Sequence, residues 1–196
     1  MSTDAERHEF DASQVAELLA ELDRRLRRRG VCASVFVVGG AAVAVAGIRG
    51  ERLTEDVDVV TDQQVVLEEA SLLARERGLA ENWLNPNARM WMPPLPDGVL
   101  DLPDELGLRV TYADDGFLFA TKLIAQRAKD AEDVVALARH LEMQHASTDE
   151  LEAHIRRYYT DDAALVFIVD GDDVDREIRY LAEDAARMLK RRAASE

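Results

Sequence analysis

The sequence predicts an α+β fold in which a small mixed sheet is flanked by helices and followed by a helical C-terminal half. Short apolar runs of strand character alternate with helical spacing over residues 1–115, whereas helical spacing continues alone over residues 116–196. A chain of 196 residues can bury a substantial core without disulfides, and this chain holds a single cysteine. We therefore expect an α/β core over residues 1–115 and a helical region over residues 116–196 packed on it.

The predicted core begins with a helix, a strand and a second helix. Apolar residues recur at helical spacing over residues 11–29, and Asp11 with Gln14 forms a capping-box pattern at the start of this segment. The short apolar run over residues 34–38 predicts a buried strand. Residues 41–46 form a short helix of small side chains, which would allow the helix to pack closely on the sheet.

The remaining core elements follow a polar loop over residues 49–55. The second strand is expected over residues 56–60, and the helix after it ends at Gly78. Residues 81–98 hold four of the five prolines and both tryptophans, which favours an ordered, packed loop because disordered segments seldom contain so many large apolar groups. Two weaker strands are expected over residues 99–102 and 108–112.

The C-terminal half is predicted to consist mainly of helices. They are expected over residues 117–127, 130–143 and 147–159, and from residue 174 onward. Ser147 and Glu150 form a capping box for the third of them, whereas residues 163–169 are ambiguous between strand and helix. The spacing in the last helix places these residues on its inner face: Val174, Ile178, Leu181, Ala185 and Met188.

The charge of the chain argues against a protein that grips a long nucleic acid. The formal net charge is −15, whereas such proteins normally carry a basic footprint. Two basic runs, over residues 24–29 and 190–192, lie at the ends of predicted helices. We interpret them as solvated helix ends that complement the helix dipole, with anion-binding patches as the alternative.

The sequence suggests neither a signal peptide nor a membrane-spanning segment. The first ten residues contain no apolar segment of the signal-peptide type. The longest apolar run, over residues 31–48, is interrupted by glycines and is poorly suited to span a membrane. We therefore expect a cytoplasmic protein with no membrane partner.

Two acidic residues, Asp56 and Asp58, alternate with valines in the second predicted strand. Successive side chains point to opposite faces of a strand, so both carboxylates should point to one side, with their Cα atoms about 6.5–7 Å apart. Two like charges are costly to bury together unless a positive group joins them. The pattern favours a Mg²⁺ or Mn²⁺ ion that binds a phosphate chain, with a solvated acidic face as the alternative.

Two glycines precede this acidic pair and follow the first predicted strand. Gly39 and Gly40 lack a Cβ atom and would let the backbone approach a phosphate closely. Together with the acidic pair, they resemble the signature of the polymerase-β-like nucleotidyltransferase superfamily. The residues that carry this resemblance are Gly39, Gly40, Arg52, Thr54, Asp56 and Asp58.

Two further segments extend the resemblance. "LAENWLNPNAR" (residues 79–89) resembles the Trp-Leu-Asn segment of small bacterial nucleotidyltransferase-like proteins of the DUF6036 type. "FLFATKLIAQRAKDAEDV" (residues 117–134) resembles a helix pair of the same group, and also the toxin component of AbiE-type toxin–antitoxin systems. The matching blocks lie within residues 35–141.

The resemblance implies a magnesium-dependent enzyme that moves a nucleoside monophosphate from an NTP to a hydroxyl group on a tRNA or a protein. It also implies an antitoxin protein as a partner. The implied catalytic residues are Asp56, Asp58 and Lys122, with Asp56 and Asp58 as the metal ligands. The implied nucleotide-binding residues are Gly39, Gly40, Arg52, Thr54, Lys122, Arg127 and Asp130. The alternative is an inactive module of the same fold that binds within a toxin–antitoxin or regulatory pair.

The roles of the C-terminal candidates and of a third acid stay open. Lys122 lies on the apolar face of its helix, where triphosphate oxygens, Asp130 or Asp133 could pair with it, or where its head could reach solvent. Asp130 is also well placed to cap the next helix. Polymerase-β-like transferases usually have a third carboxylate on a later strand. The strand over residues 108–112 offers no acid, which leaves Asp101 as the alternative.

Overall fold

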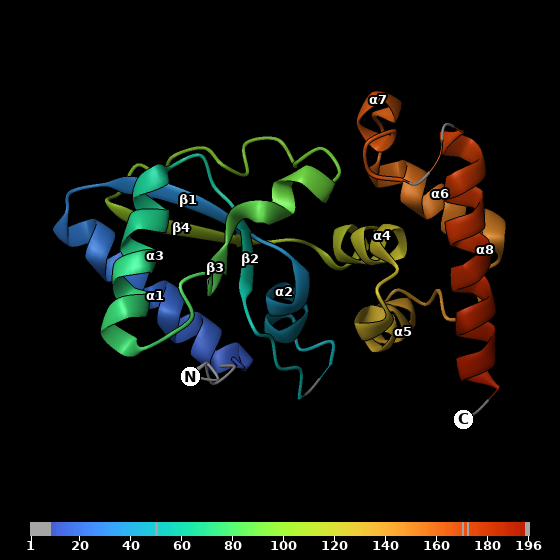
Figure 1. The fold of residues 1–196 in the computed structure, drawn as a ribbon, viewed down its shortest axis with the longest axis horizontal. Helices are drawn as coiled ribbons and strands as arrows, with labels where there is room; N and C mark the ends of the chain where they lie inside the picture. The colour runs from blue at the N-terminus through green and yellow to red at the C-terminus, as the bar shows by residue number, and fades with distance from the viewer. Residues whose placement is uncertain (1–8, 50, 170, 172, 195–196) are drawn as a thin grey trace, which may run out of the picture. The chain divides into compact units, whose positions relative to one another are not determined.

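The structure, a computed structural model, describes residues 9–49, 51–169, 171 and 173–194. Most of the segment on which the absence of a signal peptide was predicted, residues 1–8, lies outside the described residues. The chain divides into two compact units, and Figure 1 labels the elements of both. The first unit comprises Met1–Arg89 with Pro96–Ala113, and the second comprises Met90–Leu95 with Asp114–Glu196.

The first unit is built on a four-stranded mixed sheet with the order β3-β2-β1-β4. Strand β1 pairs antiparallel with β2 and parallel with β4, and β2 pairs parallel with β3. The expected α+β class with a small mixed sheet is therefore confirmed. The strands span Cys32–Val37 (β1), Val57–Val60 (β2), Leu84–Asn85 (β3) and Gly107–Tyr112 (β4).

Three helices accompany this sheet: α1 (Ala12–Arg28), α2 (Gly39–Val45) and α3 (Gln64–Arg77). The capping box at the start of α1 is confirmed, since the Asp11 side chain accepts from the Gln14 backbone while the Gln14 side chain accepts from the Asp11 backbone. Gly78 ends α3 in the left-handed conformation, as the sequence predicts. The apolar face of α1 is buried through Val15, Leu18, Leu19, Leu22 and Leu26.

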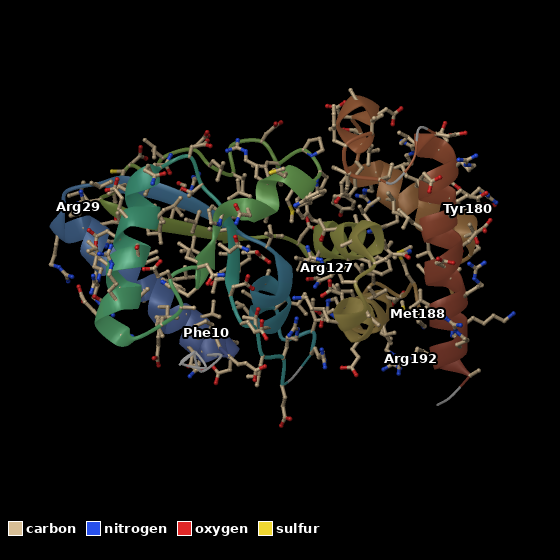
Figure 2. The ribbon with its side chains drawn as sticks, viewed as in Figure 1. Phe10, Arg29, Arg127, Tyr180, Met188 and Arg192 are labelled. Carbon is tan, nitrogen blue, oxygen red and sulfur yellow. The ribbon has the colours of Figure 1, made fainter. Side chains whose placement is uncertain are left out.

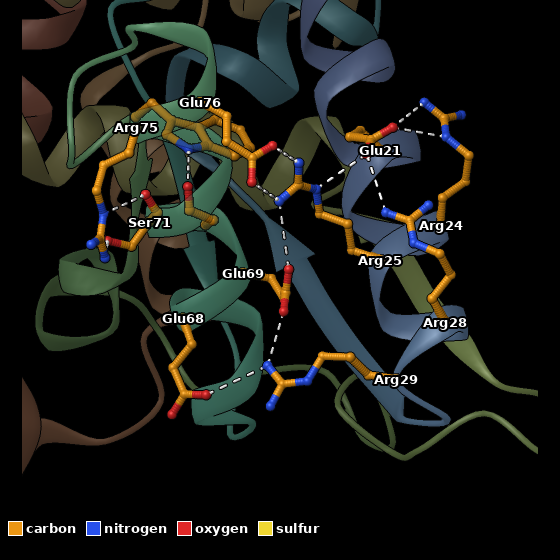
Figure 3. Close-up of polar contacts among 12 residues, drawn as sticks. Glu21, Arg24, Arg25, Arg28, Arg29, Glu68, Glu69, Ser71, Arg75 and Glu76 are labelled. Carbon is orange, nitrogen blue, oxygen red and sulfur yellow. Dashed lines mark hydrogen bonds and ion pairs between the residues drawn. The ribbon is translucent and has the colours of Figure 1, made fainter.

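Ion pairs join α1 to α3 in the first unit (Figure 3). Arg25 pairs with Glu76 and lies 3.7 Å from Glu69, while Arg29 pairs with Glu69 at 2.9 Å. The hydrogen bond from Arg25 holds the pKa of the Glu76 carboxyl below its ordinary value. The basic run at the end of α1 is therefore partly engaged with a neighbouring helix. Glu76 and Arg29 are exposed, and an ion pair with an exposed partner contributes about 0–1 kcal/mol, so the buried leucines of α1 contribute more to stability.

The segment between α3 and β4 is ordered and packed, as predicted, but it lacks one of the predicted strands. Trp83 is fully buried, and its indole nitrogen donates to the Ala70 carbonyl at 2.9 Å. A strand was predicted over residues 99–102, and this prediction is wrong. The backbone there forms turns, because the amide of Asp101 binds the Gly98 carbonyl and the amide of Val99 binds the Pro96 carbonyl. These bonds use amides that a strand would offer to a neighbour.

The second unit is helical. Its elements are α4 (Asp115–Ala125), the short 3-10 helix η2 (Ala128–Asp130), α5 (Ala131–His140), α6 (Thr148–Tyr158), α7 (Asp162–Leu165) and α8 (Val174–Ala193). A further 3-10 helix, η1 (Pro86–Trp91), crosses the boundary between the units in sequence. The capping box of Ser147 and Glu150 is confirmed at the start of α6. The ambiguous residues 163–169 form the end of α7 and the turns after it.

The buried face of α8 is rotated slightly from the predicted one. Ile178 and Ala185 are buried as expected, but Leu181 and Met188 are only half-buried, and Ala182 and Leu189 take the interior positions. Each buried residue, Ala182 or Leu189, follows the predicted one by one position, which is about 100° around a helix. None of the helices formed by the described residues is both long and apolar enough to cross a bilayer.

Candidate functional site

The two acidic residues of the predicted site point to the same side, as the alternation of a strand requires. Asp56 immediately precedes β2, and Asp58 is the second residue of that strand. The side-chain amide of Asn85 donates to Asp58 Oδ1 at 2.9 Å and to Asp56 Oδ2 at 3.3 Å. Because one nitrogen contacts both carboxylates, the two acids converge on a common point in the first unit.

Asn85 is a site residue that the sequence reasoning did not select. It occupies β3, whose register places Asp58 and Asn85 opposite each other on neighbouring parallel strands. Its own oxygen accepts from the Asn87 amide at 3.1 Å, which fixes the side-chain nitrogen toward the acids. The available signal was the segment Trp83-Leu84-Asn85, in which the buried tryptophan anchors the short strand that presents the asparagine.

The two glycines permit close contacts at the start of α2. Gly39 has a φ of 65°, and a Cβ atom there would lie 2.5 Å from Asp58 Oδ2. A Cβ atom on Gly40 would lie 2.9 Å from an Arg52 guanidinium nitrogen and 3.0 Å from Thr54 Oγ1. Both positions therefore require a residue without a side chain if the neighbouring groups are to keep their places.

Thr54 and Arg52 are thus part of the same region of the first unit. The hydroxyl of Thr54 donates to the Asp56 carbonyl at 2.8 Å, and the Thr54 backbone pairs with that of Phe10. The Arg52 guanidinium donates to the Leu53 carbonyl. The structure therefore brings together six residues that the sequence selected: Gly39, Gly40, Arg52, Thr54, Asp56 and Asp58.

The donor set around the acidic pair fits a hard divalent cation. Mg²⁺ prefers carboxylate and amide oxygens and usually keeps several water ligands, so it is commonly held by only one or two carboxylates. Within the described residues there is no group of three or more His, Cys, Asp or Glu side chains that could hold a metal. Asp56 and Asp58 are the carboxylates that would bind such an ion, and Asn85 is the neutral side chain beside them.

Asp101 is not placed to act as a third acid. Its carbonyl accepts from the Ser34 hydroxyl at 2.6 Å, and Ser34 lies on β1. The β1–β2 register puts Ser34 level with residue 62, four residues beyond Asp58 and therefore about 13 Å from it along the sheet.

Lys122 lies in the second unit, where two carboxylates bind it. Its Nζ atom is 2.5 Å from Asp130 Oδ1 and 3.1 Å from Asp133 Oδ2, and the three side chains are 8, 5 and 0% exposed. The alternative in which the lysine head reaches solvent is therefore wrong. Asp130 occupies the N-cap position of α5, but its side chain makes no capping hydrogen bond because it accepts from Lys122 instead.

Arg127 also belongs to the second unit and lies between α4 and η2. Since Lys122, Arg127 and Asp130 belong to a different unit from the acidic pair, their action on the same nucleotide stays a prediction.

Comparisons of the chain with protein-family models, curated proteins and solved structures found no significant match.

Proposed function

We propose that the chain is a magnesium-dependent nucleotidyltransferase that moves a nucleoside monophosphate from an NTP to a hydroxyl group on a tRNA or a protein. The observation that carries the proposal is the convergence of Asp56 and Asp58 on the single amide nitrogen of Asn85. Two carboxylates this close together can bind Mg²⁺ through oxygen lone pairs that Asn85 does not use, and the ion would supply positive charge to the phosphates during transfer.

The residues around the pair would position the triphosphate. Gly39 and Gly40 let the Asp58 carboxylate and the Arg52 guanidinium lie directly against the backbone at the start of α2. Arg52 places a cation in the same region. The Thr54 hydroxyl holds the Asp56 carbonyl and so fixes the turn that presents the acids. Asn85 holds both carboxylates in one orientation, which would reduce the ordering needed when a ligand binds.

The candidates in the second unit support the proposal less directly. The Lys122 ammonium is already bound to Asp130 and Asp133. It would therefore have to exchange or share these partners to contact a phosphate. A catalytic role for Lys122 and nucleotide binding by Arg127 and Asp130 rest on the resemblance, as do the tRNA or protein acceptor and an antitoxin partner.

A second candidate function is a catalytically inactive module of the same fold, acting within a toxin–antitoxin or regulatory pair. One observation favours it: the acidic pair has no third acid beside it in the part of the chain that the structure describes. Two-metal transfer commonly requires such a group to hold the second ion. This candidate would bind Mg²⁺ and an NTP without transferring the nucleotide.

Incubation with α-labelled NTPs, Mg²⁺ and either total RNA or cell extract tests the first proposal. We expect a labelled RNA or protein, and its loss in Asp58→Asn. Asp62→Asn is the matched control, because Asp62 is exposed, pairs with Arg89 and undergoes the same change of charge. Thermal stabilisation by Mg²⁺ and an NTP, lost in Asp58→Asn but without any labelled product, would support the inactive module. The absence of both responses would refute both candidates.

A further inference from the structure

The second unit contains a pocket of about 350 Å³ that lies apart from the acidic pair in the first unit and includes Lys122 and Arg127 in its lining. It lies between the end of α4, the connection to α5, and one face of α8. Its volume is in the range of sites that hold small organic ligands. Figure 2 labels Arg127 and Met188, which line it from the α4–α5 connection and from α8.

The lining combines an apolar surface with cationic groups. Met188 and Ala131 contribute partly exposed apolar side chains, and Met188 can adapt its shape to a flat ligand. Four lining residues are cationic and one, Asp184, is acidic, in a chain whose formal net charge is −15. The pocket is therefore a local exception to the charge of the whole protein.

The cationic groups differ in how far they are already engaged. Lys122 is bound by two carboxylates, and Arg187 pairs with Asp184 and Glu183. Arg191 also has a polar partner. Among the described residues, Arg127 has neither an ion pair nor a side-chain hydrogen bond, although it lines the pocket. Its guanidinium group can therefore bind an anion without giving up a partner.

The character of the ligand follows from these groups. A guanidinium fork matches the oxygens of a phosphate and can bind two of them at once. Arg187 and Arg191, one helical turn apart on α8, add further N–H donors on the opposite wall. The apolar wall is suited to a ring or hydrocarbon attached to the phosphate.

We propose that this pocket binds a small phosphate monoester with an apolar or aromatic body, of the size of a nucleoside monophosphate. Arg127 binds the phosphate, and Met188 and Ala131 contact the body. This goes beyond the proposed transfer reaction, because the ligand is held within the second unit and needs neither the acidic pair nor a metal ion.

Calorimetric titration of the full chain in EDTA tests the proposal, with AMP, GMP, CMP and UMP as probes. We expect saturable binding of at least one nucleotide at one site per chain, and weaker binding of inorganic phosphate and of the matching nucleoside. Arg127→Ala should weaken binding about tenfold or more, which corresponds to about 1.4 kcal/mol. Arg192→Ala, which removes the same charge from α8 outside the pocket, should leave binding unchanged.

Several outcomes would overturn the proposal. One is the absence of saturable binding for every probe. Another is an equal loss of affinity in Arg127→Ala and Arg192→Ala, which would indicate only general charge attraction. Binding of inorganic phosphate as tight as that of the nucleotides would refute the role of the apolar wall. Loss of binding in Asp58→Ala would place the ligand at the acidic pair. Retained binding in Asp58→Ala supports the pocket, even if the transfer reaction is not found.

Discussion

Replacement of Lys122 by methionine should strongly destabilise the second unit. The ammonium group lies 2.5 Å from Asp130 and 3.1 Å from Asp133, and none of the three side chains is more than 8% exposed. Methionine keeps most of the apolar stem and its packing, but it removes the cation that both Asp130 and Asp133 contact. The loss of stability therefore comes mainly from the missing ion pairs, and little of it from a cavity left by the side chain.

The expected magnitude follows from burial. Removing one partner of a buried ion pair costs about 3–5 kcal/mol, because the remaining charge stays desolvated. Here two acids lose their common partner, so we expect a loss within or above that range. Urea denaturation followed by far-UV circular dichroism measures it, since the second unit is helical.

Two further variants make the result specific. Lys129→Met removes the same charge from an exposed position in η2 and should change the free energy of unfolding by no more than about 0.5 kcal/mol. Adding Asp133→Asn to Lys122→Met should recover part of the loss, because it removes the repulsion between the two buried carboxylates that Lys122 had joined. A free energy of unfolding for Lys122→Met within about 1 kcal/mol of the parent chain would refute the structural role of this cluster.

Three other changes have defined outcomes. Gly39→Ala should lower the thermal stability by about 1–3 kcal/mol, more than Gly30→Ala, because the former adds a contact with Asp58 and the latter meets no atom within 4 Å; equal losses would contradict this. Asn85→Ala should cost about 1 kcal/mol in EDTA by urea denaturation, because two carboxylates lose a donor; no loss would argue against the bridge. Burial lowers the pKa of His154, so the unfolded chain binds a proton more readily, and stability should fall as the pH drops below about 6.5. His154→Phe should reduce the change in melting temperature between pH 7.5 and pH 5.5 (about one unit either side of that value). An unchanged dependence of the melting temperature on pH would contradict the role of His154.

Local signals predicted much of the fold. The capping boxes at Asp11 and Ser147 and the glycine after α3 are short-range features that act within one turn of a helix, and all three are confirmed. The false strand over residues 99–102 shows the limit of such reasoning. Its apolar residues fit a strand, but turn hydrogen bonds around Gly98 take its amides.

The sequence predicted those residues of the candidate site that lie in or next to a single strand. Alternation along β2 was enough to place Asp56 and Asp58 on one side. Asn85 could not be found in this way, because its place depends on the pairing of β3 with β2 across a long connection. Likewise, the spacing of Lys122, Asp130 and Asp133 allowed several pairings, and only the fold of the α4–α5 connection selects the one observed.

The contact between position 40 and Arg52 has a consequence for how this chain could vary. The guanidinium group sits in the volume that a β-carbon on residue 40 would need. A serine at position 40 and the present position of the Arg52 guanidinium are mutually exclusive. A side chain at position 40 therefore requires the end of Arg52 to move, whereas a smaller residue at position 52 makes no such demand on Gly40.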